Sequence, residues 1–298
     1  MDFRKITLED VETLKKFRVS GDMSCENTFT SLLIWRDIYN NSIAIEDDTL
    51  FISSDFGEGV VYSIPFTKNM EKAIDALKKH NNGVPVTIWA QEGARFDEFY
   101  KKFGSDYDFI SDEDYFDYIY LQKDLAELNG KKYHSKRNHI SAFSKAHNWH
   151  YETINDTNIQ LVRECAEKWY NENLERDQKH FSIEKQGVYL LLDNFEKTDL
   201  KGGAIFCDGM VVAFTLGSEI SDTVFNIHIE KALSDYSTAY AVINREFAKN
   251  ELSDYVYINR EDDMGLEGLC KAKLSYKPER LIKKYYCIPK ENNDVGKE

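Results

Sequence analysis

A β-hairpin in the second half of the chain is the feature that most limits the possible folds. Two apolar segments, 203–207 and 210–217, flank the dipeptide Asp208-Gly209. Asp-Gly supplies the two positive φ angles that a two-residue hairpin turn requires. A third strand pattern follows at 223–230, so this region is expected to form an antiparallel sheet.

Helical and strand patterns alternate along the rest of the chain. After the hairpin, periodicity predicts a helix at 238–249, a strand at 255–259, a short helix at 266–274 and a last strand at 281–288. The first third also mixes both patterns, for example in a helix at 69–80. We therefore expect an α+β fold, in which helices flank mixed, mostly antiparallel sheets.

The chain is long enough for two domains. It has 298 residues, of which 42% are hydrophobic, so two medium-sized cores are possible. Acidic and aromatic residues interleave at 104–120, which we interpret as a surface loop and a half-buried strand. We place the boundary after this segment, giving an N-terminal domain at 1–121 and a C-terminal domain at 122–298.

Composition and missing motifs exclude several classes of protein. No apolar run of about 18 residues and no signal peptide are present, so we expect a cytoplasmic protein. Five scattered cysteines without a C-x-x-C pair speak against disulfides and zinc, and no metal site is expected. The motifs G-x-S-x-G, G-x-x-x-x-G-K-[ST], G-x-G-x-x-G and H-E-x-x-H are also missing, which disfavours hydrolases, NTPases and dehydrogenases.

The net charge of −14 repels nucleic acid and anionic lipid over most of the surface. The dense basic run at 131–139 is an exception, and it opens a predicted helix at 133–147. On that helix Lys136 falls on the apolar face and Arg137 borders it. Either these side chains snorkel or pair with acids, or they contact phosphate of a ligand such as tRNA or coenzyme A.

The strand pattern at 223–230 alternates strictly between apolar and polar side chains. One face is expected to carry Phe225, Ile227 and Ile229, and the other Asn226, His228 and Glu230. If the polar face lines a cleft, Glu230 or His228 could act as a general base and Asn226 as a substrate contact. If it faces solvent, it is the hydrated side of a sheet.

A charged run at 259–265 leaves a strand and opens a short helix. An N-terminal cap on this helix would account for one acidic residue, either Asp262 or Asp263. It does not account for all the charged residues at 259–265. On the helix itself Lys273 lies within the apolar arc, whereas Lys271 does not. Lys273 is therefore expected either to snorkel or to reach an anion.

Three stretches resemble a known family. The element order of 201–288 looks like the core of the GNAT acyltransferase fold. Residues 260–278 resemble the D-x-G-x-x-G-L-x-x-A-K-x-S region of the soluble C-terminal domain of phosphatidylglycerol lysyltransferases. Residues 121–143 and 26–36 are similar to a soluble, uncharacterised branch of that family.

This resemblance implies two tandem GNAT-like domains, as in the Fem aminoacyl ligases. It also implies transfer of an amino acid from aminoacyl-tRNA to a lipid, peptide or small-molecule acceptor, with no cofactor required. The expected catalytic residues are Asp262, Asp263, Glu230 and His228. The expected substrate-binding residues are Lys136, Arg137, Asn226, Arg260, Lys271 and Lys273.

Two other functions stay open. Acetyl-CoA-dependent GNAT enzymes bind pyrophosphate on a glycine-containing R/Q-x-x-G-x-G/A loop, and the equivalent segment 232–239 has no glycine and contains Asp235. An acyl-CoA donor would therefore need an atypical loop. A binding module without catalytic activity would show the same loss. The acceptor and the oligomeric state are left open.

Overall fold

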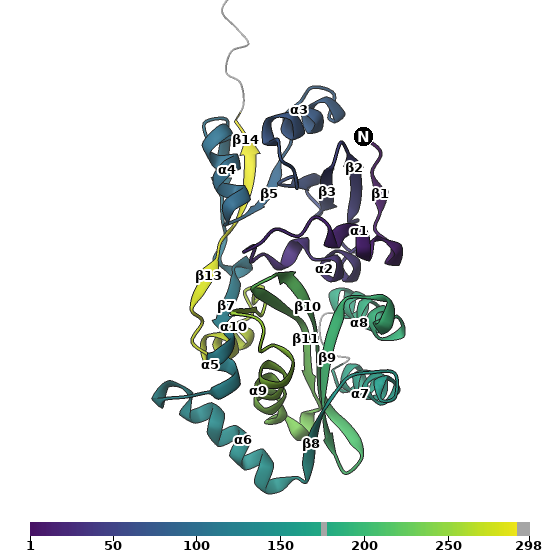
Figure 1. Cartoon of the computed structure of the whole chain (residues 1–298), viewed down its shortest axis with the longest axis vertical. Helices are drawn as coiled ribbons and strands as arrows, with labels where there is room; N and C mark the ends of the chain where they lie inside the picture. The colour runs from purple at the N-terminus through teal and green to yellow at the C-terminus, as the bar shows by residue number, and fades with distance from the viewer. Residues whose placement is uncertain (174–177, 291–298) are drawn as a thin grey trace, which may run out of the picture.

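The chain folds into two sheets, which lie one above the other in Figure 1. The computed structural model describes residues 1–173 and 178–290. In order across the first sheet, the strands are β1 (Arg4–Lys5), β2 (Ser42–Glu46), β3 (Thr49–Asp55), β4 (Val60–Ser63), β5 (Ile88–Gln91), β14 (Lys284–Pro289) and β6 (Tyr107–Ile110). In order across the second, they are β13 (Arg280–Ile282), β7 (Asp117–Leu121), β12 (Tyr257–Asn259), β11 (Val224–Ala232), β10 (Met210–Ser221), β9 (Leu200–Cys207) and β8 (Trp149–Thr153).

Neighbouring strands are antiparallel except in two pairs, β4 with β5 and β11 with β12. The expected hairpin is confirmed, because Asp208 and Gly209 adopt φ angles of 50° and 81° between β9 and β10. The α+β class is confirmed as well, since both sheets are mostly antiparallel and flanked by helices.

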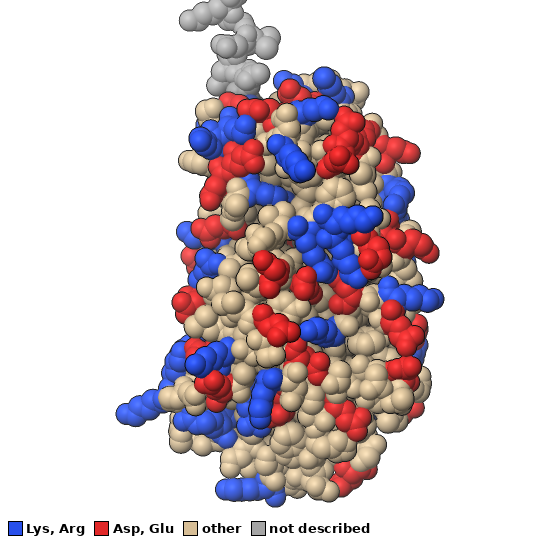
Figure 2. All heavy atoms as spheres, viewed as in Figure 1, with Lys and Arg blue, Asp and Glu red and all other residues tan. Residues whose placement is uncertain are grey.

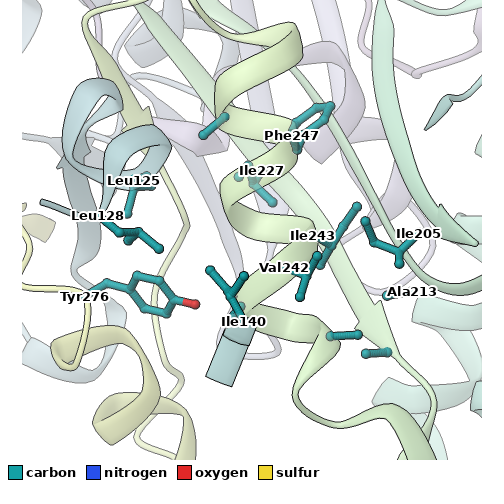
Figure 3. Packing of buried hydrophobic residues seen from close by; sticks show 14 of the residues in the cluster. Leu125, Leu128, Ile140, Ile205, Ala213, Ile227, Val242, Ile243, Phe247 and Tyr276 are labelled. Carbon is teal, nitrogen blue, oxygen red and sulfur yellow. The ribbon is translucent and has the colours of Figure 1, made fainter. Parts of the chain in front are cut away.

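Helices cover both faces of the second sheet (Figure 1). One face packs against α5 (Gln122–Glu127), α6 (His134–Ala146) and α9 (Ala239–Glu251), and the other against α7 (Ile159–Glu172) and α8 (Gln178–Asp193). Figure 3 shows the first of these cores, in which Val242 and Ile243 of α9 meet Ile205 and Ala213 of the sheet. The short helix α10 (Glu267–Leu274) follows β12.

The first sheet has its own helices, and two more lie between the sheets. Helices α3 (Met70–His80) and α4 (Ala94–Phe103) pack on the first sheet. Helices α1 (Val11–Lys15) and α2 (Phe29–Ile34) share a core with β3 and with residues of α8. None of the helices in the described ranges combines the length and hydrophobicity needed to cross a membrane.

The predicted strand at 281–288 is wrong as a single element. It consists of β13, which pairs with β7 in the second sheet, and β14, which inserts between β5 and β6 in the first. The yellow chain in Figure 1 passes from one sheet to the other between them. The reading of 104–120 as a surface loop with a half-buried strand holds for β6 and the exposed segment 111–115. It is wrong for β7, because four of the five residues of that strand are buried within the second sheet. The boundary after Leu121 stays a prediction.

A bulge breaks the expected alternation of β11. The register between β10 and β11 shifts between Leu216 and Gly217, so the two strands contribute unequal numbers of residues. Ile227 consequently packs against α9, whereas Ile229 packs with α7 and α8. The prediction that Phe225, Ile227 and Ile229 share one face is therefore wrong beyond Ile227. The prediction that Glu230 shares a face with Asn226 and His228 is wrong as well, because Glu230 binds Asn244 of α9.

Candidate functional site

The polar residues of interest meet where the two sheets join. Asn259 ends β12, and its side chain ties three segments together. Its Nδ2 donates to the carbonyl oxygen of Met23 at 2.7 Å and to Asp117 at 2.8 Å. Its Oδ1 accepts from the backbone N–H of Glu261 at 2.6 Å, which turns the chain sharply after β12. Asn259 thus positions the charged run relative to both halves of the molecule.

A buried lysine with three acidic partners lies at this junction. Lys284 is the first residue of β14, and its side chain is 0% exposed. Its Nζ lies 2.6 Å from Glu26 Oε1, 2.7 Å from Asp117 Oδ1 and 3.1 Å from Asp262 Oδ2. Burial opposes the charged ammonium, but the surrounding acids outweigh it and raise the pKa of Lys284 well above its ordinary value.

The three acids respond differently to the same lysine. Asp117 also accepts hydrogen bonds from Asn259 and from the N–H of Cys25, and these partners with Lys284 overcome its burial and lower its pKa. For Glu26 and Asp262 burial dominates, and the pKa of each carboxyl is raised despite Lys284. Three carboxylates therefore share one ammonium, which leaves an excess of negative charge at the junction.

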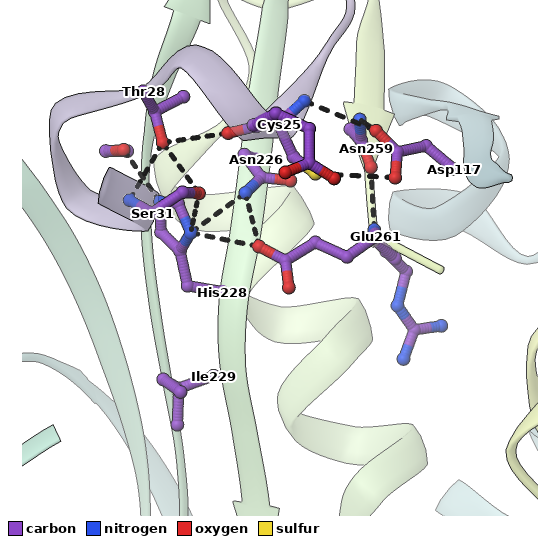
Figure 4. A network of polar contacts seen from close by, with 12 residues as sticks. Cys25, Thr28, Ser31, Asp117, Asn226, His228, Ile229, Asn259 and Glu261 are labelled. Atoms are coloured by element: carbon purple, nitrogen blue, oxygen red, sulfur yellow. Dashed lines mark hydrogen bonds and ion pairs between the residues drawn. The ribbon is translucent and has the colours of Figure 1, made fainter. Parts of the chain in front are cut away.

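His228 is the centre of a second network, shown in Figure 4. Its Nε2 lies 2.8 Å from Ser218 Oγ, and its Nδ1 lies 3.0 Å from Glu261 Oε1. Asn226 Nδ2 donates to the same Glu261 oxygen at 2.8 Å. Thr28 caps the N-terminus of α2, and this cap places Ser31 Oγ 3.4 Å from His228 Nδ1.

Arg260 and Glu230 form an ion pair on the α9 side of the sheet. Arg260 Nη2 lies 2.8 Å from Glu230 Oε1, and Asn244 Nδ2 of α9 donates to Glu230 Oε2 at 3.0 Å. The guanidinium also lies 4.8 Å from the ring centre of Tyr276. Lys136 approaches the same ring at 3.8 Å, and burial together with Arg260 lowers the pKa of Lys136 to about 8.

Lys273 and Asp263 hold the loop between β12 and α10. Lys273 Nζ donates to the carbonyl oxygens of Arg260 and Glu261, and burial followed by the charge of Arg260 lowers its pKa to about 8. Asp263 accepts from the hydroxyl of Tyr118 at 2.5 Å and from the N–H of Gly265 at 3.0 Å. These bonds keep Glu261 in the left-handed region, at φ 59°, which non-glycine residues rarely adopt.

Most of the sequence-predicted residues converge at this junction. They are Asn226, His228, Glu230, Arg260, Asp262, Asp263 and Lys273, and Lys136 lies beside them across Tyr276. Two others lie apart. Arg137 donates to the carbonyl oxygens of Leu128 and Gly130, whereas Lys271 pairs with Glu267 on the exposed face of α10. Their predicted roles in binding substrate are not tested by these contacts.

Four residues of the junction were not predicted, namely Glu26, Asp117, Glu261 and Lys284. Asp117 and Glu261 lie within charged runs that the sequence does reveal. A lysine at the head of an apolar strand was the available signal for Lys284. No local pattern signals its pairing with Glu26, because 258 positions separate the two residues.

Comparisons with known proteins agree with this architecture. A conserved protein of unknown function from Bacteroides thetaiotaomicron is 34% identical, with a TM-score of 0.89 over 97% of this chain and 100% of that one. The structure of L-PGS from Bacillus licheniformis has the same fold, with 14% identity and a TM-score of 0.63 over 95% of this chain and 92% of that one.

Sequence comparison extends these likenesses. An uncharacterized protein of Mycoplasmoides gallisepticum is 28% identical over 174 residues, or 56% of this chain, and the match spans about half (54%) of that curated relative. The model of one family, described as phosphatidylglycerol lysyltransferase, C-terminal, matches residues 17–288. Because that match covers most of the sequence, the chain belongs to the phosphatidylglycerol lysyltransferase C-terminal family.

Proposed function

We propose that the protein transfers an aminoacyl group from aminoacyl-tRNA to an acceptor amine or hydroxyl. The family and the fold indicate a transferase of the phosphatidylglycerol lysyltransferase type. The identity of the donor is a finer question, and it depends on what the junction between the sheets is built to bind.

The observation that carries the proposal is a surplus of hydrogen-bond acceptors at the junction. Glu26 and Asp262 each use one carboxylate oxygen on Lys284, and among the side chains that the structure describes no donor reaches the other oxygen. Their side chains are 30% and 19% exposed, so a ligand can reach these oxygens. The side-chain oxygen of Asn226 is buried at the junction and likewise lacks a partner among the described residues. A buried acceptor without a donor, such as the Asn226 oxygen, is costly, and a bound ligand with N–H groups relieves that cost while pairing with the free oxygens of the two partly exposed carboxylates.

The α-ammonium group of an aminoacyl ester supplies what the junction lacks. It brings three N–H donors and one positive charge to a place with excess carboxylate. An acetyl group brings neither. The surplus therefore favours an aminoacyl donor over acetyl-CoA.

Features around the junction support a phosphate-bearing donor of the same kind. Blue side chains gather in Figure 2 over α5 and α6, where the exposed residues include Lys131, Lys132 and Lys145. Lys136 lies between this surface and the junction, beside Tyr276. The segment from Leu233 to Thr238, which joins β11 to α9, contains no glycine to bring backbone N–H groups close to a pyrophosphate.

Filter binding with three ligands tests the donor. We expect charged tRNA to bind more tightly than uncharged tRNA, and acetyl-CoA not to compete with it. Asp262→Asn should reduce the preference for charged tRNA by about tenfold, because it removes a carboxylate that meets the ammonium group. Lys136→Ala should instead weaken both tRNAs and reduce the salt dependence of binding.

The matched control is Lys72→Ala, which removes an exposed lysine of α3 that pairs with Asp47 far from the junction. Its binding should equal that of the wild-type protein. Equal affinity of the wild-type protein for charged and uncharged tRNA would contradict the proposal. Competition by acetyl-CoA would favour an acyl-CoA donor instead.

A further inference from the structure

Three carboxylates at the junction have both oxygens occupied by protein donors. Asp117 binds Lys284 and Asn259, Glu230 binds Arg260 and Asn244, and Asp263 binds Tyr118 and the N–H of Gly265. Each of them would have to give up a hydrogen bond before it could take a proton from a substrate. Glu26 and Asp262 share the charge of Lys284.

Glu261 also has one held and one free oxygen, but its held oxygen binds the side chains of Asn226 and His228, whereas Glu26 and Asp262 are each paired with the ammonium of Lys284. Glu261 Oε1 accepts from Asn226 Nδ2 at 2.8 Å and lies 3.0 Å from His228 Nδ1. No donor reaches Oε2 in the described part of the chain, and in Figure 4 this oxygen points away from both partners. The side chain is 24% exposed, so a ligand can reach it.

The backbone of Glu261 is fixed as firmly as its Oε1. Its N–H donates to Asn259, and its carbonyl oxygen accepts from Lys273 Nζ at 3.0 Å and from the N–H of Tyr118 at 3.2 Å. A carboxylate held at one oxygen and along its backbone presents its second oxygen in a defined direction. Such preorganisation is what a general base requires.

His228 orients Glu261 and is itself oriented by Ser218. When the hydroxyl of Ser218 donates to Nε2 at 2.8 Å, Nδ1 carries the proton and donates it to Glu261 Oε1. When Nε2 instead donates to Ser218, Nδ1 accepts from Asn226 Nδ2 at 2.9 Å. The imidazole is buried, with 2% of its side chain exposed, so it does not itself reach a substrate. With the proton on Nδ1, one hydrogen bond runs from Ser218 to His228 and a second from His228 to Glu261 Oε1. Glu261 Oε2 is then free to meet a substrate.

We propose that Glu261 is the general base that activates the acceptor, and that His228 and Asn226 are its positioning residues. This role rests on the proposed function. The acceptor nitrogen or oxygen forms a bond to the ester carbonyl carbon, and its proton passes to Glu261 Oε2. The bond between that carbon and the ribose oxygen then breaks, and the same proton passes from Glu261 to the leaving ribose oxygen.

Single-turnover transfer from charged tRNA tests the catalytic role. Glu261→Gln keeps an oxygen that can accept from Asn226 and His228 but removes the basic oxygen. We expect its transfer rate to fall by at least about 100-fold with the Kd for charged tRNA unchanged. Added formate should restore part of the activity of Glu261→Ala. The control is Glu279→Gln, an exposed glutamate after α10, which should match the wild-type rate.

A rate for Glu261→Gln within threefold of the wild-type protein would overturn the catalytic role. So would a loss confined to the Kd for charged tRNA, because a residue with a purely structural or binding role behaves in that way.

A measurement without substrate tests the positioning of Glu261 independently of which donor the protein uses. Nitrogen-15 NMR of the imidazoles should show His228 protonated at Nδ1 in the wild-type protein and in Glu261→Gln, but not in Glu261→Ala. Protonation at Nε2 in the wild-type protein would overturn the arrangement whatever the activity. The expected form, combined with no binding of charged tRNA, would support the positioned base and reject aminoacyl-tRNA as the donor.

Discussion

At the scale of single residues, the junction keeps more negative charge than its stability favours. Glu26 and Asp262 have raised pKa values because burial penalises their ionised forms more than Lys284 stabilises them. A group whose pKa is higher in the folded state stabilises the fold below its ordinary pKa, and this contribution is lost as the pH rises through the raised value. At neutral pH these two carboxylates therefore cost stability, as functional sites commonly do.

Glu26→Gln tests this cost. The amide oxygen can still accept from Lys284, while the buried negative charge disappears. We expect the free energy of unfolding at pH 7 to rise by about 1 kcal/mol, and the gain to shrink as the pH falls toward the ordinary carboxyl range. Urea denaturation between pH 4 and 8 measures it.

Asp117→Asn should change the stability in the opposite direction to Glu26→Gln. The pKa of Asp117 is lowered, so its contribution is present at neutral pH and is lost as the pH falls through that lowered value. Its substitution should destabilise the protein at pH 7. A destabilised Glu26→Gln variant at that pH would contradict the charge excess.

Sequence alone could predict those site residues that lie close together in the chain. Arg260 and Asp262 stand in the charged run at 259–265 and Lys273 on the helix that follows it, and the structure does bring all three to the junction. Glu26 and Lys284 come from opposite ends of the chain, and their proximity depends on the strand pairing. That pairing has no local signature.

At the scale of elements, the helices and the hairpin were predictable because their periodicity is local. Helix α3 begins one residue later than predicted, and α9 begins one residue later and ends two residues later than predicted. The division of 281–288 into β13 and β14 was not predictable in this way. It depends on partner strands in two different sheets, whereas the residues themselves form one continuous strand-like run.

At the bulge between β10 and β11, position 217 has no room for a side chain. A Cβ atom at this position would lie 2.2 Å from the carbonyl oxygen of Asn226 and 2.3 Å from the ring of Phe225. We expect Gly217→Ala to lower the free energy of unfolding by about 1–3 kcal/mol. Gly268→Ala on α10, where nothing lies within 4 Å, should instead raise it by up to about 1 kcal/mol.

The urea midpoints of Gly217→Ala and Gly268→Ala, compared with that of the wild-type protein, measure these two changes in stability. Equal stability of Gly217→Ala and the wild-type protein would show that the strands can separate at the bulge without cost. Because Asn226 lies at the bulge and binds Glu261, the same variant should also disturb the junction.

At the scale of the whole molecule, the two sheets are linked by an exchange of strands. β14 follows all the strands of the second sheet in the sequence and completes the first sheet, and β7 precedes all the other strands of the second sheet yet lies between two of them. The ion pairs of Lys284 with Asp117 and Asp262 join the same elements. Either sheet can therefore lose its structure only by disturbing the other.

This linkage predicts a single unfolding transition for the whole chain. In calorimetry the measured enthalpy should equal the van't Hoff enthalpy, and near-UV and far-UV circular dichroism should change together. Two separated transitions would contradict it. A fragment of residues 1–116 should not fold alone, because β5 and β6 would lack the strand that lies between them.

The late position of β14 in the sequence also determines when the first sheet can be completed during synthesis. Every strand of the first sheet except β14 leaves the ribosome early, but the gap between β5 and β6 stays open until residues 284–289 have been made. Until then two strand edges expose unpaired N–H and C=O groups, which are sites for aggregation and chaperone binding. Translation that stops before Lys284 yields a chain without a complete first sheet and without the lysine of the junction.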